Sequence, residues 1–124
     1  MFTTMLVEDS PSFRQILKDN LQDLFPPMEI IEAGDGVEAF QKIDFHPPDL
    51  IFMDVRLPGE NGLELTRRIK ADHPGIIVIV LTSYESLEYR EAANRNKADY
   101  FFSKGAITND EIFTLVKSIV LKKA

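Results

Sequence analysis

Polar side chains that could do chemistry follow the apolar runs of this sequence. The set consists of Glu8, Asp9, Asp54, Thr82 and Lys104. If these residues meet, three carboxylates share one site, and two unit charges about 4 Å apart repel by on the order of 4 kcal/mol at an effective dielectric constant of 20. One ammonium cannot neutralise three carboxylates, whereas a hard divalent cation can. The residue types therefore predict Mg²⁺ or Mn²⁺ rather than Ca²⁺, which takes more oxygen ligands than this set offers.

The same side chains could also bind a phosphoryl group. A cation, the Thr82 hydroxyl and the Lys104 ammonium can together bind three phosphoryl oxygens, which gives the positioning and charge neutralisation that phosphoryl transfer needs. Asp54 follows the middle apolar run. It is the natural nucleophile, because carboxylates can form aspartyl phosphates.

These residues share a site only if the chain folds into a parallel sheet. Five short apolar runs alternate with segments of helical periodicity, and they cover residues 2–7, 30–33, 50–54, 76–82 and 100–103. Three of the runs contain continuously apolar stretches, which suits strands covered on both faces. The alternation predicts a doubly wound α/β fold with right-handed crossovers, in which ligands bind beyond the carboxyl ends of the strands.

The segments between the runs predict five helices. Ser10 is placed to cap the first helix, whose expected buried face includes Ile16, and a capping box between Thr108 and Glu111 opens the last. Val37 is expected to point inward from the second helix. The three middle helices are expected at residues 36–45, 62–72 and 86–95.

Length and composition set limits on function. The 124 residues predict one domain spanning residues 1–124, and the absence of cysteine excludes disulfides and thiol chemistry. The net charge of −6 counts against direct binding to nucleic acid. No apolar run approaches the roughly 18–20 residues that cross a bilayer, and the acidic pair Glu8-Asp9 follows the first run too soon for a signal peptide, so a cytoplasmic location is expected.

The order of these residues along the chain is similar to that of a known family. Glu8-Asp9, then Asp54 with Pro58 and Gly62 behind it, then Thr82 and Lys104, resemble the site of the bacterial two-component response-regulator receiver (CheY-like) domain. The resemblance covers essentially the whole chain. It implies a flavodoxin-like, five-stranded parallel sheet of order 2-1-3-4-5 with five helices, a topology that the family itself exemplifies.

The resemblance also implies a role for each acidic residue. Asp54 would accept a phosphoryl group from a phosphohistidine on a sensor histidine kinase or phosphotransfer protein. Asp9 would bind Mg²⁺ directly and Glu8 through water, and the backbone carbonyl of Arg56 would complete the protein ligands.

Two further residues would serve as a switch. Thr82 would hydrogen-bond the phosphoryl group and move inward, Lys104 would form an ion pair with it, and Phe101 would follow Thr82 inward. The face made by the fourth helix, the fifth strand and the fifth helix would then change its binding to a partner or to a second copy in a homodimer.

Several positions depart from the commoner family pattern. Gly105 follows Lys104 where proline is frequent, and a trans bond is expected because a cis bond before a non-proline residue costs about 2.5–4 kcal/mol. Lys97 replaces a usual glycine. Arg56 and Tyr84 flank the site and could shield an acyl phosphate from water or from a phosphatase.

Two other functions compete with the phosphorylation switch. A phosphatase with an aspartyl intermediate, of the haloacid dehalogenase type, would need a second acid two residues after Asp54, where the chain has Arg56. A degenerate receiver would act as a constitutive interaction module, against which the intact site residues argue. Phosphorylation and dephosphorylation of the domain itself do not make it an enzyme. An effector domain such as a helix-turn-helix DNA-binding domain is compatible with the Lys104-Gly105 pair and the run at residues 54–59, which resemble receivers attached to such domains.

Overall fold

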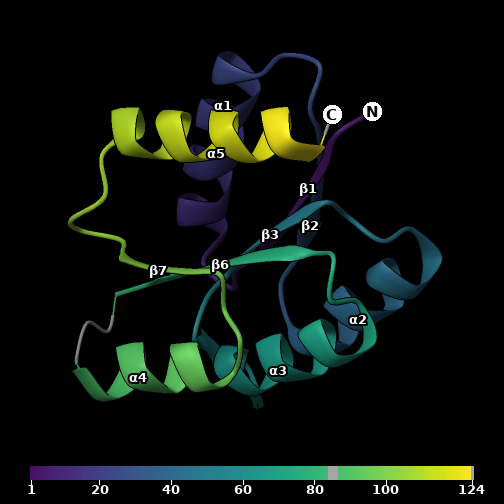
Figure 1. Ribbon diagram of the computed structural model, residues 1–124, viewed down its shortest axis with the longest axis vertical. Helices are drawn as coiled ribbons and strands as arrows, with labels where there is room; N and C mark the ends of the chain where they lie inside the picture. Colours follow the sequence, from purple (N-terminus) through teal and green to yellow (C-terminus); the bar gives the residue numbers. More distant parts are fainter. Residues whose placement is uncertain (84–86, 124) are drawn as a thin grey trace.

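A parallel sheet forms the centre of the computed structural model, which describes residues 1–83 and 87–123 (Figure 1). Its order is β2-β1-β3-β6-β7, and every pairing is parallel. Counted along the sheet strands alone, this is the predicted order 2-1-3-4-5. The strands are β1 (Thr3–Val7), β2 (Glu29–Ala33), β3 (Leu50–Met53), β6 (Ile77–Thr82) and β7 (Tyr100–Ser103).

Helices cover both faces of the sheet, as predicted for a doubly wound fold. One face carries α1 (Pro11–Leu24) and α5 (Asn109–Lys123). The other carries α2 (Gly36–Phe45), α3 (Gly62–Asp72) and α4 (Leu87–Arg95), as Figure 1 shows. The expected first residue of the fourth helix, Ser86, lies outside the described residues. Within the described residues, no helix combines the length and the apolar composition needed to span a membrane.

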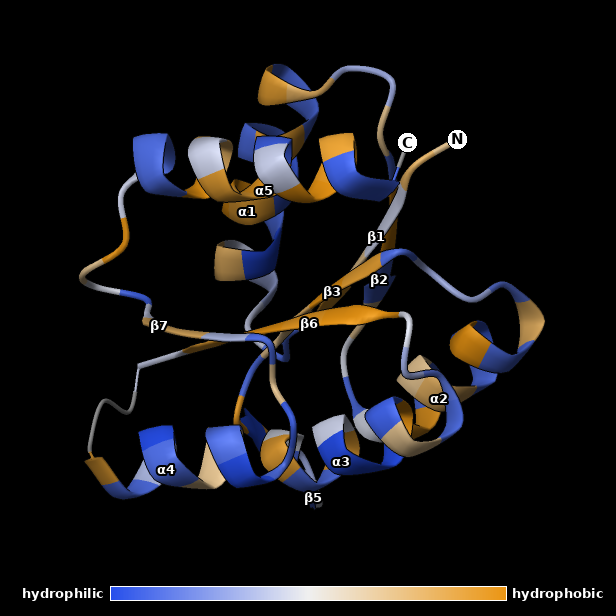
Figure 2. Ribbon diagram, viewed as in Figure 1, coloured by the Kyte–Doolittle hydropathy of each residue, from blue (hydrophilic) through white to orange (hydrophobic). Residues whose placement is uncertain are grey.

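Alternate residues of each central strand enter two different cores. In β1 and β3, Leu6 and Phe52 pack with the helices α1 and α5, whereas Met5 and Ile51 belong to the core on the opposite face. This explains why the strand sequences are continuously apolar: neither face of the strand meets water. Figure 2 shows the result, with hydrophobic central strands between helices whose outer surfaces are largely hydrophilic.

Side-chain caps fix where the helices begin. The Ser10 hydroxyl accepts a hydrogen bond from the Phe13 amide at 3.4 Å. The predicted capping box is confirmed, because Thr108 Oγ1 accepts from the Glu111 amide at 3.1 Å and Glu111 Oε1 accepts from the Thr108 amide at 3.2 Å. Each bond satisfies an amide that the first helical turn leaves without an intrahelical partner.

Two side chains expected in the core are exposed. Ile16 is 58% exposed and Val37 is 61% exposed. The face that α1 buries is centred on Leu17 and Leu21, so Ile16 falls to one side of it. Val37 is likewise next to, and not on, the buried face of α2, which consists of Gly36, Ala39 and Ile43.

The end of α4 adopts a Schellman motif. The Ala98 amide donates to the Ala93 carbonyl at 3.0 Å and the Lys97 amide to the Asn94 carbonyl at 3.1 Å. Lys97 has φ = 70°, the left-handed conformation that this motif requires and that glycine adopts most easily. The position where the family usually has glycine is therefore one where the backbone favours it.

A short antiparallel hairpin was not predicted. It pairs β4 (Arg56–Leu57) with β5 (Glu60–Asn61), and Gly59 turns the chain with φ = 72°. The hairpin returns the chain from the end of β3 to the start of α3.

Candidate functional site

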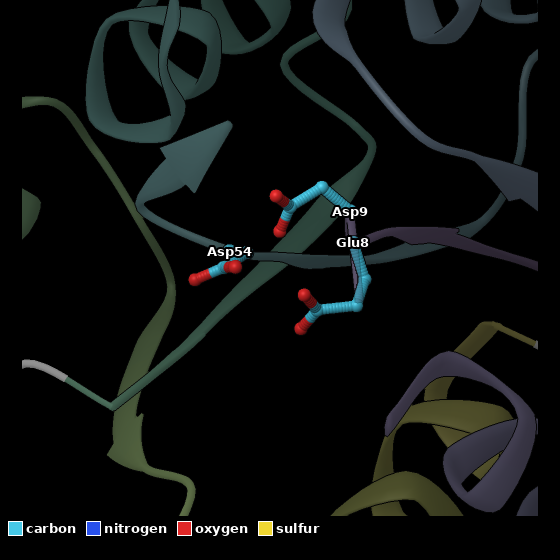
Figure 3. A group of neighbouring side chains, drawn as sticks. All are labelled: Glu8, Asp9 and Asp54. Carbon is cyan, nitrogen blue, oxygen red and sulfur yellow. The ribbon is translucent and has the colours of Figure 1, made fainter. Parts of the chain in front are cut away.

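Three carboxylates converge at the carboxyl ends of β1 and β3. One oxygen from each of Glu8, Asp9 and Asp54 lies within 4.8 Å of the others (Figure 3). Pairing of the adjacent strands brings them together, because Val7 is opposite Met53 and the Asp54 amide donates to the Val7 carbonyl at 3.0 Å. The sequence prediction that these residues share one edge of the sheet is therefore correct.

The three carboxylates differ in their exposure. Glu8 is 4% exposed and Asp54 7% exposed, whereas Asp9 is open to solvent. Burial raises the pKa of Glu8, and the nearby charge of Asp54 acts in the same direction. The opposing effects come from the Lys104 ammonium and from the Ser10 amide, which donates to Glu8 Oε2 at 3.1 Å. The site thus holds a buried acid beside an accessible one.

Lys104 supplies the positive charge of the site. Its ammonium pairs with Glu8 Oε1 and lies 3.5 Å from Asp54 Oδ2. Its backbone amide donates to the Thr82 carbonyl at 2.8 Å, which fixes the end of β7 against the end of β6. The peptide bonds of the described residues are all trans, including the one between Lys104 and Gly105, as expected.

Thr82 and Phe101 lie on the two strands beyond β3. Thr82 is fully buried at the end of β6, and the register that pairs Met53 with Val80 brings it to the same edge as Asp54. Phe101, in β7, is half buried and lies opposite Val80 of β6. The guanidinium carbon of Arg90 lies 4.8 Å from the centroid of the Phe101 ring. A side chain of α4 thus lies over one face of the ring.

Arg56 is exposed in β4, two residues after Asp54. Tyr84, the other residue expected to flank the site, lies outside the described residues. The expectation that these two side chains shield the site stays a prediction.

Two residues of the site were not found from their own chemistry. Gly62 lies so close to Asp54 that a Cβ added to Gly62 would be 1.8 Å from the backbone oxygen of Asp54. The Gly62 amide donates to the Val55 carbonyl at 2.7 Å. The centroid of the Phe13 ring lies 4.3 Å from Lys104 Nζ. The signal for Phe13 was its place in the first turn of the helix that follows Glu8-Asp9.

The donor set fits a hard divalent cation. Three carboxylates carry three negative charges and Lys104 one positive charge, so ionised side chains leave a net charge of −2 at the cluster. All three acidic side chains offer oxygen ligands, which Mg²⁺ prefers, and the exposed Asp9 leaves room for the waters that Mg²⁺ retains.

The fold and this edge of the sheet define a class: a flavodoxin-like α/β domain whose carboxylate cluster lies beyond the central strands. Residues 4–117 match the family model described as response regulator receiver domain. The chain belongs to this family and is a receiver domain of a two-component response regulator. Receiver domains are signalling domains, not classical enzymes, and they interact with histidine kinases or phosphotransfer proteins.

Curated relatives agree with this assignment. The chain is 36% identical over 102 residues to the oxygen regulatory protein NreC of Staphylococcus carnosus. The aligned residues cover 81% of this chain and 45% of that protein. It is 34% identical over 100 residues to the chemotaxis protein CheY of Halobacterium salinarum, and the aligned residues cover 81% of this chain and 82% of that protein. An uncharacterised response regulatory protein of Vibrio cholerae is 36% identical over 101 residues, 80% of this chain and 38% of that protein. The chain thus spans less than half the length of two of these relatives.

Solved structures show the same architecture. The N-terminal domain of an uncharacterised protein from Wolinella succinogenes has a TM-score of 0.88 and 29% identity, over 99% of this chain and 97% of the other. The signal receiver domain of a DNA-binding response regulator from Colwellia psychrerythraea has a TM-score of 0.91 over 97% of this chain and 98% of the other. At 24% identity, that second likeness supports the fold alone.

Proposed function

We propose that this chain, as one domain over residues 1–124, is a Mg²⁺-dependent phospho-acceptor in which Asp54 receives a phosphoryl group from a sensor histidine kinase or phosphotransfer protein. The observation that carries the proposal is the position of the buried Asp54 carboxylate, which lies 3.5 Å from the Lys104 ammonium and within 4.8 Å of two further carboxylates. The Lys104 ammonium offsets negative charge at this acid, and a carboxylate oxygen is the nucleophile that the reaction needs.

Glu8, Asp9 and Asp54 would hold the cation, with the backbone carbonyl of Arg56 as a further ligand by resemblance to the family. When bound, Mg²⁺ would neutralise charge on the carboxylates and on the incoming phosphoryl oxygens. Asp9 is the accessible member, so it is the residue through which the cluster meets solvent.

The chain's own residues supply the remaining requirements. One Asp54 carboxylate oxygen forms a bond to phosphorus while the bond between phosphorus and the donor imidazole nitrogen breaks, and the electron pair of that bond stays with the imidazole. Lys104 pairs with the transferred group, and Thr82 donates its hydroxyl hydrogen to it. Both residues lie at the carboxyl ends of neighbouring strands, at the edge of the sheet that also holds Asp54.

The expected response is a change in the face formed by α4, β7 and α5. Movement of Thr82 toward the phosphoryl group would be followed by Phe101, whose ring now lies under Arg90. This face would then alter its affinity for a protein partner or a second copy of the chain. The net charge of −6 of the whole chain argues against direct contact with nucleic acid.

Intact-mass measurement tests the proposal. The protein is incubated with Mg²⁺ and acetyl phosphate, and a gain of one phosphoryl group is expected. Asp54→Ala should abolish the gain, whereas Asp44→Ala, which removes an exposed carboxylate on α2, should leave it unchanged. A gain that persists in Asp54→Ala, or no gain in the unaltered chain, contradicts the proposal.

A further inference from the structure

The aromatic ring of Phe13 forms one wall of the Lys104 site. Lys104 Nζ lies 4.3 Å from the ring centroid, within the range of a cation–π interaction. The other described partners of this ammonium are the carboxylates of Glu8 and Asp54. The side chain of Lys104 is only 14% exposed, so water contributes little to holding the ammonium in place.

The two kinds of contact differ in one important respect. Glu8 and Asp54 are also members of the carboxylate cluster suited to a cation, so their oxygens cannot serve the cation and the ammonium fully at the same time. The face of Phe13 is uncharged and has no oxygen to offer a cation. It therefore remains available to Lys104 whichever way the carboxylates are engaged.

Local structure holds the ring where this contact requires it. The Phe13 amide donates to the Ser10 hydroxyl at the start of α1, directly after Glu8 and Asp9. The next residue, Arg14, donates from Nη1 to the Glu8 backbone carbonyl at 2.6 Å. The segment that carries the acidic pair and the turn that carries the ring are thus tied to each other.

We propose that Phe13 is a positioning residue, whose ring keeps the Lys104 ammonium beside Asp54 while the carboxylates bind the cation. The inference rests on the proposed function of this site and adds a residue to it. Since the ammonium is largely removed from water, losing the aromatic face should slow a step that needs Lys104 in place by about three- to thirty-fold.

A fluorine series at residue 13 separates this role from packing. Phe13 is replaced in turn by 4-fluoro-, 3,5-difluoro- and 3,4,5-trifluorophenylalanine, which weaken the negative face of the ring with little change in its shape. The rate constant for phosphorylation by acetyl phosphate should fall stepwise along the series. Phe13→Tyr should retain the rate, and Phe13→Leu should slow it by about three- to thirty-fold. A rate that is flat along the series overturns the proposal.

Phe113 provides the matched control. Its ring also lies under a lysine, with Lys117 Nζ at 5.7 Å from the centroid, and it stacks on Phe25 at the far end of α1 from Ser10. The same fluorine series at residue 113 should leave the phosphorylation rate unchanged. An equal fall in both series would mean that the effect is not specific to Lys104, which also overturns the proposal.

A second readout does not depend on phosphorylation. In NMR spectra at saturating Mg²⁺, the ε-methylene protons of Lys104, assigned with Lys104→Arg, should be shifted upfield by the Phe13 ring and should lose that shift in Phe13→Leu. If the ε-methylene protons of Lys104 show no upfield shift, the inference about Phe13 is overturned, but the proposed function is not. If the unaltered protein takes up no phosphoryl group, the proposed function fails, and this NMR comparison still decides whether Phe13 holds Lys104.

Discussion

The backbone oxygen of Asp54 occupies the space where a side chain at residue 62 would begin. A Cβ built on Gly62 would lie 1.8 Å from this oxygen and 2.8 Å from the carbonyl carbon. The hairpin of β4 and β5 folds the chain back onto Asp54, the proposed acceptor, and only a residue without a Cβ allows that approach. The geometry of Asp54 therefore depends on a glycine that has no polar side chain of its own.

Gly62→Ala should both destabilise the protein and disturb the acceptor. Because the clash is with backbone, we expect a loss of about 3 kcal/mol in the free energy of unfolding, at the upper end for overpacking. Phosphorylation by acetyl phosphate should fall with it. Gly75→Ala is the control, since no atom lies within 4 Å of its added Cβ. Equal stability of the two variants in urea titrations would contradict this reading of the close approach.

Mg²⁺ should stabilise the protein through the carboxylate cluster. A ligand that binds only the folded state adds about 2.7 kcal/mol at a concentration 100 times its dissociation constant. Differential scanning calorimetry should show a melting temperature that rises with Mg²⁺ concentration. Asp9→Ala should remove most of this rise, while Asp44→Ala, away from the cluster, should keep it. An undiminished rise in Asp9→Ala would show that the cation binds elsewhere.

Glu8 should make the metal-free protein less stable as pH rises. Burial raises its pKa in the folded state, so the folded protein holds a proton that the unfolded chain has released. The stabilisation is complete below the ordinary glutamate pKa and is lost as pH rises through the raised folded value. The slope for one proton cannot exceed about 1.4 kcal/mol per pH unit.

Glu8→Gln tests this linkage, because glutamine has no proton to lose. In urea titrations without Mg²⁺ at a series of pH values, the difference in stability between Glu8→Gln and the unaltered protein should move in favour of the variant as pH increases. The dissociation constant for Mg²⁺ of the unaltered protein should decrease over the same interval, since ionised carboxylates bind cations better. A constant difference across that interval would rule out a raised pKa at Glu8.

Lys97→Gly should stabilise the fold. A residue with a Cβ costs roughly 1–2 kcal/mol in the left-handed conformation. Glycine offsets part of the relieved strain, because its unfolded chain has more conformational entropy to lose on folding, which costs about 0.5–1 kcal/mol. A net gain of about 1 kcal/mol is therefore expected in thermal or urea unfolding. Lys97→Ala keeps the Cβ and should show no such gain; if it gains as much, the lysine charge and not the backbone is responsible.

Phe101 should report the switch directly. The chain contains no tryptophan, so Phe101→Trp introduces a single tryptophan. The tryptophan emission, excited selectively beyond the tyrosine absorption, should change on adding Mg²⁺ and acetyl phosphate, and Asp54→Ala in the same background should prevent the change. Phe45→Trp, at a position 92% exposed, should show none. Identical responses at both positions would mean that the signal does not come from movement of Phe101.

Much of the fold was predictable because its strong signals are local. The continuously apolar strands and the caps at Ser10 and Thr108 each appear within a few adjacent residues, and the helices 36–45 and 62–72 begin and end as expected. The gathering of Glu8, Asp54 and Lys104 followed from topology, since parallel strands bring their carboxyl ends to one edge.

The features that were not predicted from the sequence depend on contacts between distant segments. The strands β4 and β5 have two residues each, which is too short for any periodicity to show. The close approach of Gly62 to Asp54 and the contact of Phe13 with Lys104 arise only once the chain is folded. The exposure of Val37 was missed for a related reason: near a helix start, a shift of one residue moves a side chain about 100° around the axis.

The strand that leads to the proposed acceptor, Asp54, has little freedom to move. β3 is paired on both sides, and all four of its residues are buried between the two cores. A charged group added to Asp54 cannot be accommodated by displacing β3 without disrupting close packing on both faces. β7, in contrast, is at the margin of the sheet, and each of its residues is only half buried. If Asp54 accepts a phosphoryl group as proposed, this architecture keeps the modified residue in place while the edge strand can shift. A chemical change at the centre of the molecule would then alter its outer surface.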